Sequence, residues 1–317
     1  GGSSRAACLQ FARGPGQDDE SKIVGGSCVS VQALRTLPIV SGTLYVVATP
    51  IGNLDDLAPR ARQTLGTVDR IAAEDTRHTG RLLTHIGVKT PQTALHEFNE
   101  SAAAKGLVDA LLAGEDIALV SDAGTPLLSD PGFRLVRAAH DAGVRIVPVP
   151  GPSAVVAALS VAGLATDRFC FEGFLPAKSV GRRRRLEALR DESRTLVFYE
   201  AVHRVAETLE EMAAVFGPAR DATLARELTK LHEEVRRAAL GELAAMARDG
   251  SLTMKGEFVI VVAGAAVDHA GSVDADTLLK ELVAVLPGKQ AAAIVARVTG
   301  ESRNAVYQRM LELKERQ

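Results

Sequence analysis

Polar residues that could carry chemistry gather in four loops that are rich in glycine and proline. Each loop follows a short apolar run: ATPIGNLDD (48–56), AAEDTRHTGRLL (72–83), SDAGTPLLSDPG (121–132) and PGPSA (150–154). Taken singly, such a loop is more often a structural turn, because glycine and proline are the usual turn residues. In open α/β sheets, however, ligands bind beyond the carboxyl ends of the strands. Four polar loops at strand ends therefore favour a binding site at that edge.

The second loop holds the densest set of reactive side chains. Glu74, Asp75, Arg77 and His78 directly follow the apolar run. A carboxylate there could orient or deprotonate a hydroxyl, and Arg77 could hold an anionic group. The same residues would also suit the start of a helix, whose dipole favours carboxylates. The sequence weighs these two interpretations evenly.

A basic run within KSVGRRRRLEALR (178–190) is the strongest local concentration of charge. Five cations fall within eight residues, namely Lys178, Arg182, Arg183, Arg184 and Arg185. Such a cluster can neutralise backbone phosphates, although it would also suit the solvated start of a helix. Because the chain as a whole has a net charge of −2, the run favours contact with RNA or DNA.

Several familiar signatures are missing from the sequence. It has no G-x-G-x-x-G after the first apolar run, no G-x-x-x-x-G-K-[ST] and no G-x-S-x-G. Its three cysteines, Cys8, Cys28 and Cys170, lack zinc spacing, so no metal is predicted, and they fit a reducing compartment. The longest apolar stretch, about residues 154–165, is shorter than the roughly 20 residues of a membrane span. We therefore expect a cytoplasmic protein without membrane contact.

The elements that must position these loops alternate in type along the chain. From Thr43 onward, short apolar runs such as TLYVVA, IALV and EFVIVVAG are separated by helical patterns. One such pattern places Val205, Leu209, Met212 and Phe216 on one helix face. This alternation predicts an α/β architecture with largely buried sheets. The chain of 317 residues is long enough for two domains.

We predict the domain boundaries from the turn-rich segments. The Pro-Gly-Pro at 150–152 separates an N-terminal α/β domain (41–152) from a C-terminal α/β domain (153–266), and Ser153 is placed to cap the helix that follows. Residues 1–40 are expected to be a disordered extension, and 267–274 a linker. Residues 275–317 have a helical pattern with a glycine-containing turn, which predicts a helix-turn-helix-like domain. The alternative is a plain helical hairpin.

Eight stretches, taken in order, resemble a known family. They are TLYVVATPIGNLDDL, AAEDTRHTGRLL, SDAGTPLLSDPG, PVPGPSA, FEGFLP, FYEAVHR, RELTKLHEE and KGEFVIVV. Together they resemble the ribosomal RNA small subunit methyltransferase I family, of the tetrapyrrole-methylase-like class of S-adenosylmethionine enzymes. The tail resembles the small C-terminal helix-turn-helix domain of that family.

The resemblance carries expectations about fold and function. It implies two α/β domains of the tetrapyrrole-methylase type, with the donor cleft between them, and a homodimer. It implies 2′-O-methylation of a cytidine ribose in the decoding region of 16S rRNA. The cofactor would be S-adenosyl-L-methionine, and the partner would be 16S rRNA or the 30S ribosomal subunit.

Site residues are carried over by matching motif. The donor would be held by Pro50, Asp122, Ala123, Gly124, Thr125, Ser153, Ala154, Tyr199, Glu200, Leu228 and Glu257. The attacking hydroxyl must lose a proton, so we expect Glu74 or Asp75 to accept it. Arg77 would hold a phosphate or the ribose. Lys230 is a second candidate for the base, provided that burial lowers its pKa.

Within the third loop we expect two separate roles. Asp122 to Thr125 would form the turn that binds the donor. Ser129 or Asp130 would cap the following helix, with Pro131 in its first turn.

Two other functions compete with the rRNA assignment. A small-molecule methyltransferase of the same fold, acting on a precorrin-like ring, would share the donor loops. It would need neither the basic run nor the helical tail. A non-enzymatic regulator that binds nucleic acid through the tail would have no use for the donor loops.

Overall fold

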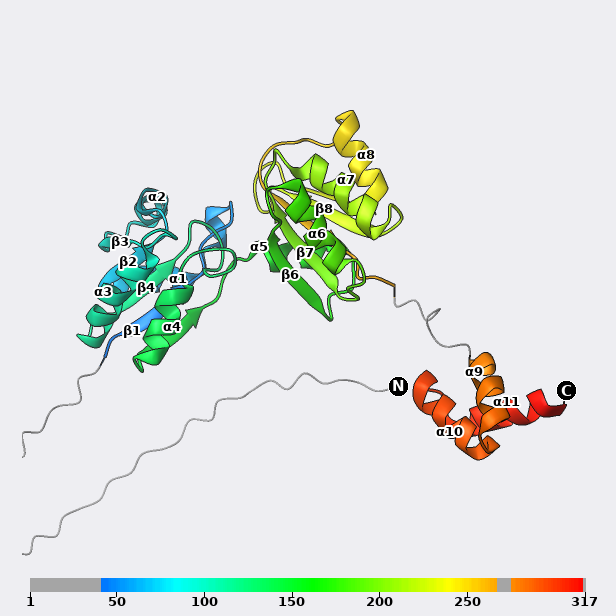
Figure 1. The fold of residues 1–317 in the computed structure, drawn as a ribbon. Coiled ribbons are helices and arrows are strands. Elements are labelled where there is room, and N and C mark those ends of the chain that lie inside the picture. The colour runs from blue at the N-terminus through cyan, green and yellow to red at the C-terminus, as the bar shows by residue number, and fades with distance from the viewer. Residues whose placement is uncertain (1–40, 267–274, 316–317) are drawn as a thin grey trace, which may run out of the picture. The chain divides into compact units, whose positions relative to one another are not determined.

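The computed structural model describes residues 41–266 and 275–315. This part of the chain folds into two five-stranded sheets with helices on their faces, followed by a group of helices at the C-terminus (Figure 1). The predicted α/β class is confirmed. The predicted extension (1–40) and linker (267–274) lie outside the described residues.

The first sheet is parallel throughout. Its strands are β1 (Thr43–Val47), β2 (Arg70–Ala73), β3 (Gln92–Ala94), β4 (Ile117–Val120) and β5 (Arg145–Val149). They lie in the order β3-β2-β4-β1-β5. Because the strands are parallel, their carboxyl ends meet at one edge, as the loop pattern predicted. All four residues of β4 are buried, as expected for a strand covered on both faces.

Two helices cover each face of this sheet. The 3₁₀ helix η1 (Leu54–Asp56) leads to α1 (Pro59–Thr67), which packs with α2 (Thr76–Ile86) on one face. The helices α3 (Glu100–Leu112) and α4 (Phe133–Asp141) pack on the other. Asp75 caps α2 by accepting a hydrogen bond of 2.8 Å from the amide of Arg77.

The second sheet is mixed. Its strands are β6 (Phe169–Phe174), β7 (Thr195–Glu200), β8 (Asp221–Arg226), β9 (Glu234–Ala239) and β10 (Phe258–Val262), in the order β6-β7-β10-β8-β9. Only β6 and β7 are parallel. One face packs against α5 (Ala154–Ala162). The other packs against α6 (Ser179–Leu189), α7 (Val205–Phe216) and α8 (Leu240–Asp249).

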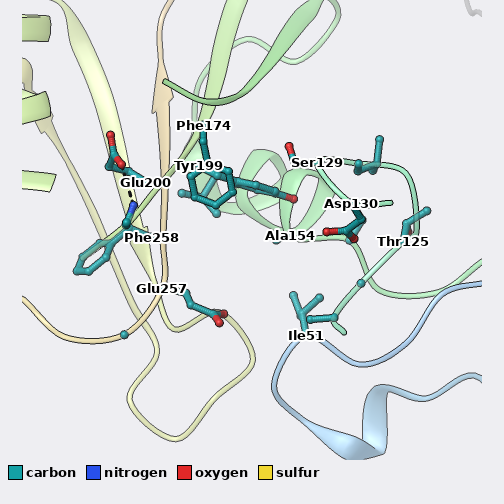
Figure 2. Close-up of a pocket in the computed structure, with 17 residues that line it drawn as sticks. Ile51, Thr125, Ser129, Asp130, Ala154, Phe174, Tyr199, Glu200, Glu257 and Phe258 are labelled. Carbon is teal, nitrogen blue, oxygen red and sulfur yellow. Dashed lines mark hydrogen bonds between the residues drawn. The ribbon is translucent and has the colours of Figure 1, made fainter. Parts of the chain in front are cut away.

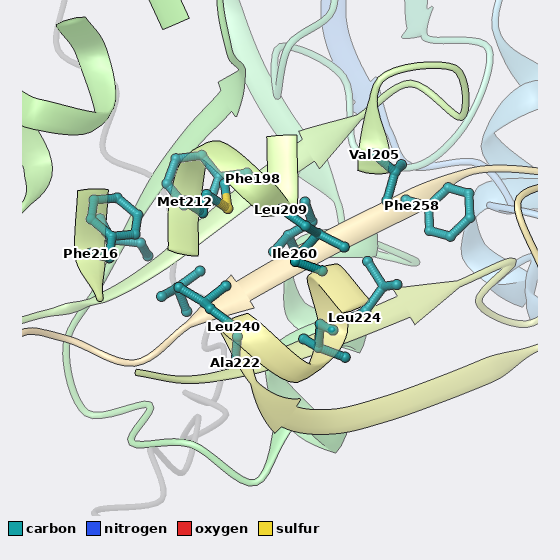
Figure 3. Close-up of a cluster of buried hydrophobic side chains, with 14 of the residues drawn as sticks. Phe198, Val205, Leu209, Met212, Phe216, Ala222, Leu224, Leu240, Phe258 and Ile260 are labelled. Atoms are coloured by element: carbon teal, nitrogen blue, oxygen red, sulfur yellow. The ribbon is translucent and has the colours of Figure 1, made fainter. Parts of the chain in front are cut away.

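The core on that second face confirms the predicted helical stripe. Val205, Leu209, Met212 and Phe216 of α7 are all buried, and Figure 3 shows them in one core with Phe198, Phe258 and Ile260 of the sheet. Each sheet falls within one of the predicted stretches 41–152 and 153–266, whose boundaries stay a prediction.

The C-terminal helices have a core of their own. They are α9 (Ala275–Val285), α10 (Gly288–Thr299) and α11 (Arg303–Glu315). Leu279, Val295, Val306 and Met310 are buried among them. Gly300 ends α10 in the left-handed conformation, with φ +74°, so the turn before α11 is built as predicted. None of the helices that the structure describes has the length and apolar character needed to cross a membrane.

Candidate functional site

A cavity of about 380 Å³ is lined by loops from both sheets (Figure 2). The first half of the chain contributes Ile51 and parts of the loop after β4. The second half contributes the start of α5, the ends of β6 and β7, and the start of β10. The lining residues are Ile51, Ala123, Gly124, Thr125, Leu128, Ser129, Asp130, Ser153, Ala154, Phe174, Tyr199, Glu200, Ala201, Gly256, Glu257, Phe258 and Val259.

Most of the predicted donor residues meet at this cavity. Eight of them line it, namely Ala123, Gly124, Thr125, Ser153, Ala154, Tyr199, Glu200 and Glu257. Pro50 and Asp122 line a smaller neighbouring cavity together with His78. Leu228 is buried in the core beneath α5. The structure thus brings together loops that are far apart in the sequence, while the roles of these residues stay predictions.

Hydrogen bonds tie three of the strand-end loops together. The amide of Gly124 donates to the carbonyl of Thr49 (3.1 Å), and the amide of Thr49 donates to the carbonyl of Gly124 (2.9 Å). The hydroxyl of Thr125 donates to the carbonyl of Pro152 (3.0 Å). Gly124 has φ +83°, and a Cβ there would lie 3.2 Å from Ile51 Cγ2. This position therefore favours glycine on both conformational and steric grounds.

The second half of the third loop differs from the prediction. Leu128, Ser129 and Asp130 line the cavity, and α4 begins only at Phe133 with Gly132 in the capping position. Neither Ser129 nor Asp130 caps the helix, and Pro131 precedes it. The reason lies in α3, because Glu100 accepts hydrogen bonds from the amides of Gly132 (3.0 Å) and Arg134 (2.7 Å).

Backbone strain accompanies this arrangement. Leu127 and Ser129 have φ of +75° and +71°, which L-residues rarely adopt. Strained residues of this kind cluster at binding sites, where the surrounding structure holds them. The repeated Ser-Asp of the loop was the only sequence signal that could have pointed to Asp130.

Ser153 is in the capping position of α5, as predicted, but its side chain makes no capping hydrogen bond. Its hydroxyl is buried at the cavity and has no hydrogen-bond partner among the described residues. A buried hydroxyl without a partner costs free energy. It is therefore available to a ligand in the cavity.

The wall of the cavity is acidic and aromatic. Burial raises the pKa of Asp130 to about 6, and the charges of Glu74 and Asp122 add to this effect. Burial also raises the pKa of Tyr199 to about 12, so its phenol stays neutral. The Tyr199 ring packs edge-on against Phe174, with 5.6 Å between ring centroids.

The two glutamates of the cavity have different environments. Glu200 is buried and accepts hydrogen bonds from Thr208 (2.7 Å) and Arg204 (3.1 Å), which makes it part of the local framework. The side chain of Glu257 is exposed and pairs with Lys230 at 3.0 Å.

The carboxylates after β2 are linked to the third loop. The amide of Asp122 donates to Glu74 (3.2 Å), and the amide of Asp75 donates to Asp122 Oδ1 (3.1 Å). Partial burial raises the pKa of Glu74, against the opposing hydrogen bond from Asp122. Asp75 instead pairs with the Arg77 guanidinium at 2.8 Å, and this pairing holds its pKa well below the usual range.

The two predicted cations of the site are both paired. Arg77 is largely exposed apart from its contact with Asp75. The amino group of Lys230 lies 2.8 Å from Glu227 and 3.0 Å from Glu257. Burial lowers the Lys230 pKa, but the two carboxylates outweigh it, so the pKa is raised. The condition for Lys230 to act as a base is therefore not met.

The stem of Lys230 crosses the first loop. A Cβ at Gly52 would lie 2.3 Å from Lys230 Cγ, so any other residue there would displace this lysine stem. The lysine thus joins the first loop to the carboxylates of Glu227 and Glu257.

The basic run of α6 is largely neutralised by carboxylates. Arg182 is only 1 % exposed and pairs with Glu207 (2.6 Å) and Glu211 (2.8 Å), so it does not fit the predicted contact with RNA. Arg185 pairs with Glu172, and Arg183 pairs with Glu187. Lys178 and Arg184 are exposed and lack a carboxylate partner among the described residues. A contact of these four exposed cations with RNA stays a prediction.

Within residues 41–266 and 275–315, no group of three or more His, Cys, Asp or Glu side chains is arranged to hold a metal ion. The lining of the cavity offers carboxylates, hydroxyls, backbone groups and aromatic rings to a ligand. A cationic ligand would fit this cavity best.

Comparisons with known proteins agree on one family. A family model described as tetrapyrrole (corrin/porphyrin) methylases matches residues 43–244, and one described as the RsmI C-terminal HTH domain matches residues 269–314. The chain is similar to proteins named "Ribosomal RNA small subunit methyltransferase I". It is 54% identical to that of Pseudomonas aeruginosa, over 86% of this chain and 98% of the relative. It is 52% identical to that of Escherichia coli O157:H7, over 86% and 95%.

A solved structure supports the fold. The methyltransferase CobJ covers 71% of this chain and 95% of its own, with a TM-score of 0.53 and 22% identity. At this level of identity the likeness concerns the fold alone.

Proposed function

The chain belongs to the tetrapyrrole (corrin/porphyrin) methylase family, and on that premise we propose that it is an S-adenosylmethionine-dependent methyltransferase acting on 16S rRNA. The names of relatives about half identical over nearly their whole length support the rRNA substrate. We further propose that the acceptor is the ribose 2′-hydroxyl of a cytidine in the decoding region. This finer assignment, like the homodimer, the 30S subunit as partner and the cytoplasmic location, rests on the family resemblance.

The observation that carries the proposal is the fit of the cavity to the donor. Its volume of about 380 Å³ falls within the ~300–1,000 Å³ typical of small-molecule sites. Asp130 and the aromatic rings of Tyr199 and Phe174 offer negative charge and π-faces to a cation. The unpartnered hydroxyl of Ser153 and the backbone of Ala123–Thr125 offer polar contacts to the rest of the ligand.

When bound, S-adenosylmethionine supplies an activated methyl group on a positively charged sulfur. The residues of the chain must then hold the acceptor hydroxyl in line and take its proton. Glu74 suits this task, because burial raises its pKa above the ordinary value of a glutamate and the Asp122 amide holds its carboxylate. Asp75 is committed to α2 and Arg77. Lys230 remains a cation. We therefore narrow the proposed base to Glu74, and we keep Arg77 as the group that holds a phosphate or the ribose.

Two measurements on the full chain test this function. S-adenosylmethionine at 100 times its Kd should raise the free energy of unfolding by about 2.7 kcal/mol. Tritiated methyl groups should pass to 30S subunits or to naked 16S rRNA, and should leave a ribose that resists alkaline cleavage at the modified cytidine.

The matched control is a Gly124→Val variant, which should lose donor binding because φ +83° and the nearby Ile51 exclude a branched side chain. Label that appears only on a precorrin would refute the rRNA assignment. A chain that gains no stability from the donor would refute the methyltransferase assignment altogether.

A further inference from the structure

The helices α1 and α2 form one continuous surface on the first sheet. Their apolar sides share a core that includes Leu65 of α1 and Leu82 of α2. Arg62 donates to the carbonyl of Ile86 (3.1 Å), which binds α1 to the last turn of α2. The outer sides of both helices are therefore presented together.

The two helices contribute basic side chains to this outer surface and no acidic ones. Neither helix contains an aspartate or a glutamate. Their exposed basic side chains, with the lysine that follows α2, define what we name the α1–α2 basic face: Arg60, Arg62, Arg77, His78, Arg81, His85 and Lys89.

Among the described residues, few of the five Arg and Lys side chains of this face are neutralised by a carboxylate. Arg77 pairs with Asp75, whereas Arg60 and Arg62 donate to the backbone carbonyls of Pro148 and Ile86. Among the ranges that the structure describes, the side chains of Arg81 and Lys89 have no hydrogen bond or ion pair. The carboxylates of this region lie outside the two helices. They are Asp55 and Asp56 before α1, Asp69 before β2, and Glu74 and Asp75 between β2 and α2.

The opposite side of the same sheet shows that this imbalance is local. The helices α3 and α4 carry Lys105, Arg134, Arg137 and His140, but they also carry Glu100, Asp109 and Asp141. In α6, three of the four consecutive arginines pair with carboxylates. Among the helices that cover the first sheet, α1 and α2 are thus the ones that carry basic side chains without carboxylates.

The basic face leads directly to the candidate site. The helix α2 starts immediately after Glu74 and Asp75, and His78 in its first turn lines the small cavity with Pro50 and Asp122. With 11 residues, α2 extends for about 16 Å at ~1.5 Å per residue. A chain of phosphates held along α2 would therefore run toward Glu74, the proposed proton acceptor.

We propose that the α1–α2 basic face binds the phosphodiester backbone of the RNA acceptor and directs it to Glu74. This inference rests on the proposed function, since it assumes an RNA substrate. Arginine and lysine contacts with phosphates give affinity and position but carry no sequence information. The basic face thus accounts for how the acceptor is held, while the choice of nucleotide belongs to other contacts.

The test compares two double variants of the full chain. Arg81→Gln/Lys89→Gln removes two cations of the basic face that have no partner among the described residues. Lys105→Gln/Arg137→Gln removes two exposed cations from α3 and α4, on the opposite face. For both variants, binding to 16S rRNA and to 30S subunits is measured from low to high salt, together with the Kd for S-adenosylmethionine.

We expect only the first variant to change RNA binding. Each lost phosphate contact should reduce the slope of log K against log [salt] by about 0.7–0.9, so the pair should reduce it by roughly 1.5. Affinity at low salt should fall at least tenfold, and the donor Kd should not change. Restoring the charge with Arg81→Lys/Lys89→Arg should restore the slope.

The outcomes separate the two proposals. Wild-type RNA binding with an unchanged slope for Arg81→Gln/Lys89→Gln, or an equal change for Lys105→Gln/Arg137→Gln, would overturn the basic face alone. If the wild-type chain binds neither RNA nor the 30S subunit, the rRNA function and this inference both fail.

Discussion

At the scale of single residues, three carboxylates near the cavity show how surroundings set the behaviour of one chemical group. Asp75 is stabilised as an anion by Arg77 and by the amides of α2. Glu74 and Asp130 lose water contact on burial, and their pKa values rise. The sequence could not distinguish Glu74 from Asp75, because the two are adjacent and of similar chemistry. The structure distinguishes them through the cap and the ion pair.

The first residue-scale prediction concerns the proton acceptor. Glu74→Gln should reduce single-turnover methyl transfer by about 10²–10⁴-fold, the usual contribution of a general base, without changing the donor Kd. Asp75→Asn is the matched control, because asparagine also caps helices, and its rate should stay within about tenfold of wild type. Near-normal transfer by Glu74→Gln would show that another group takes the proton.

The second concerns the stability contribution of Asp130. Its folded pKa of about 6 lies above the value of about 3.9 that an aspartate has in an unfolded chain, so the folded state binds the proton more tightly than the unfolded state. Stability should therefore fall as the pH rises from about 4 to about 6, and this loss should persist at higher pH.

Asp130→Asn should remove that loss. At pH 8 we expect a gain of about 1–2 kcal/mol in the free energy of unfolding. The full difference between the folded and unfolded pKa would give a larger gain, but the carboxylate is partly exposed and solvent screens its charge. At pH 4 the difference should vanish, and donor affinity should fall at neutral pH. Urea unfolding at both pH values measures the effect, and an equal gain at pH 4 and pH 8 would contradict it.

At the scale of elements, the sequence predicted what depends on local periodicity. The strands after Thr43 and the buried stripe of α7 follow from alternation and helical spacing. The start of α4 does not, because its amides are satisfied by Glu100, a residue more than thirty positions away in the sequence. The positive φ of Leu127 and Ser129 was also invisible, since neither residue is a glycine.

The arginine run of α6 gives an element-scale prediction. Arg182 joins α6 to α7 through Glu207 and Glu211. Arg182→Met should leave these carboxylates without their partner and lower the free energy of unfolding by about 2–4 kcal/mol, as when a buried pair is broken. Arg184→Met, which changes an exposed side chain, should stay within about 0.5 kcal/mol of wild type. Chemical denaturation measures the free energy of unfolding of both variants. Equal stability of the two would refute the structural role of Arg182.

At the scale of the whole molecule, the net charge does not reveal where the basic side chains gather on the surface. The net charge of −2 gave no sign of a nucleic-acid partner, and the most basic run in the sequence turned out to be mostly paired. The α1–α2 basic face is spread over two helices and is visible only once they are placed side by side. Eight of the residues that the family resemblance assigned to the donor line one cavity, because the motifs that carry the resemblance are continuous in sequence, while the role of these residues stays a prediction. A charged surface assembled from separate helices has no such motif.

The paired hydrogen bonds between Asp122 and the residues after β2 have an evolutionary consequence. Asp122 forms hydrogen bonds with both Glu74 and Asp75. A substitution in one loop therefore changes which residues the other loop can tolerate. The effects of mutations in the two loops are then non-additive. Variation in the loop around Asp122 and in the loop around Glu74 should be inherited as matched combinations, and a change tolerated in one relative can be harmful in another.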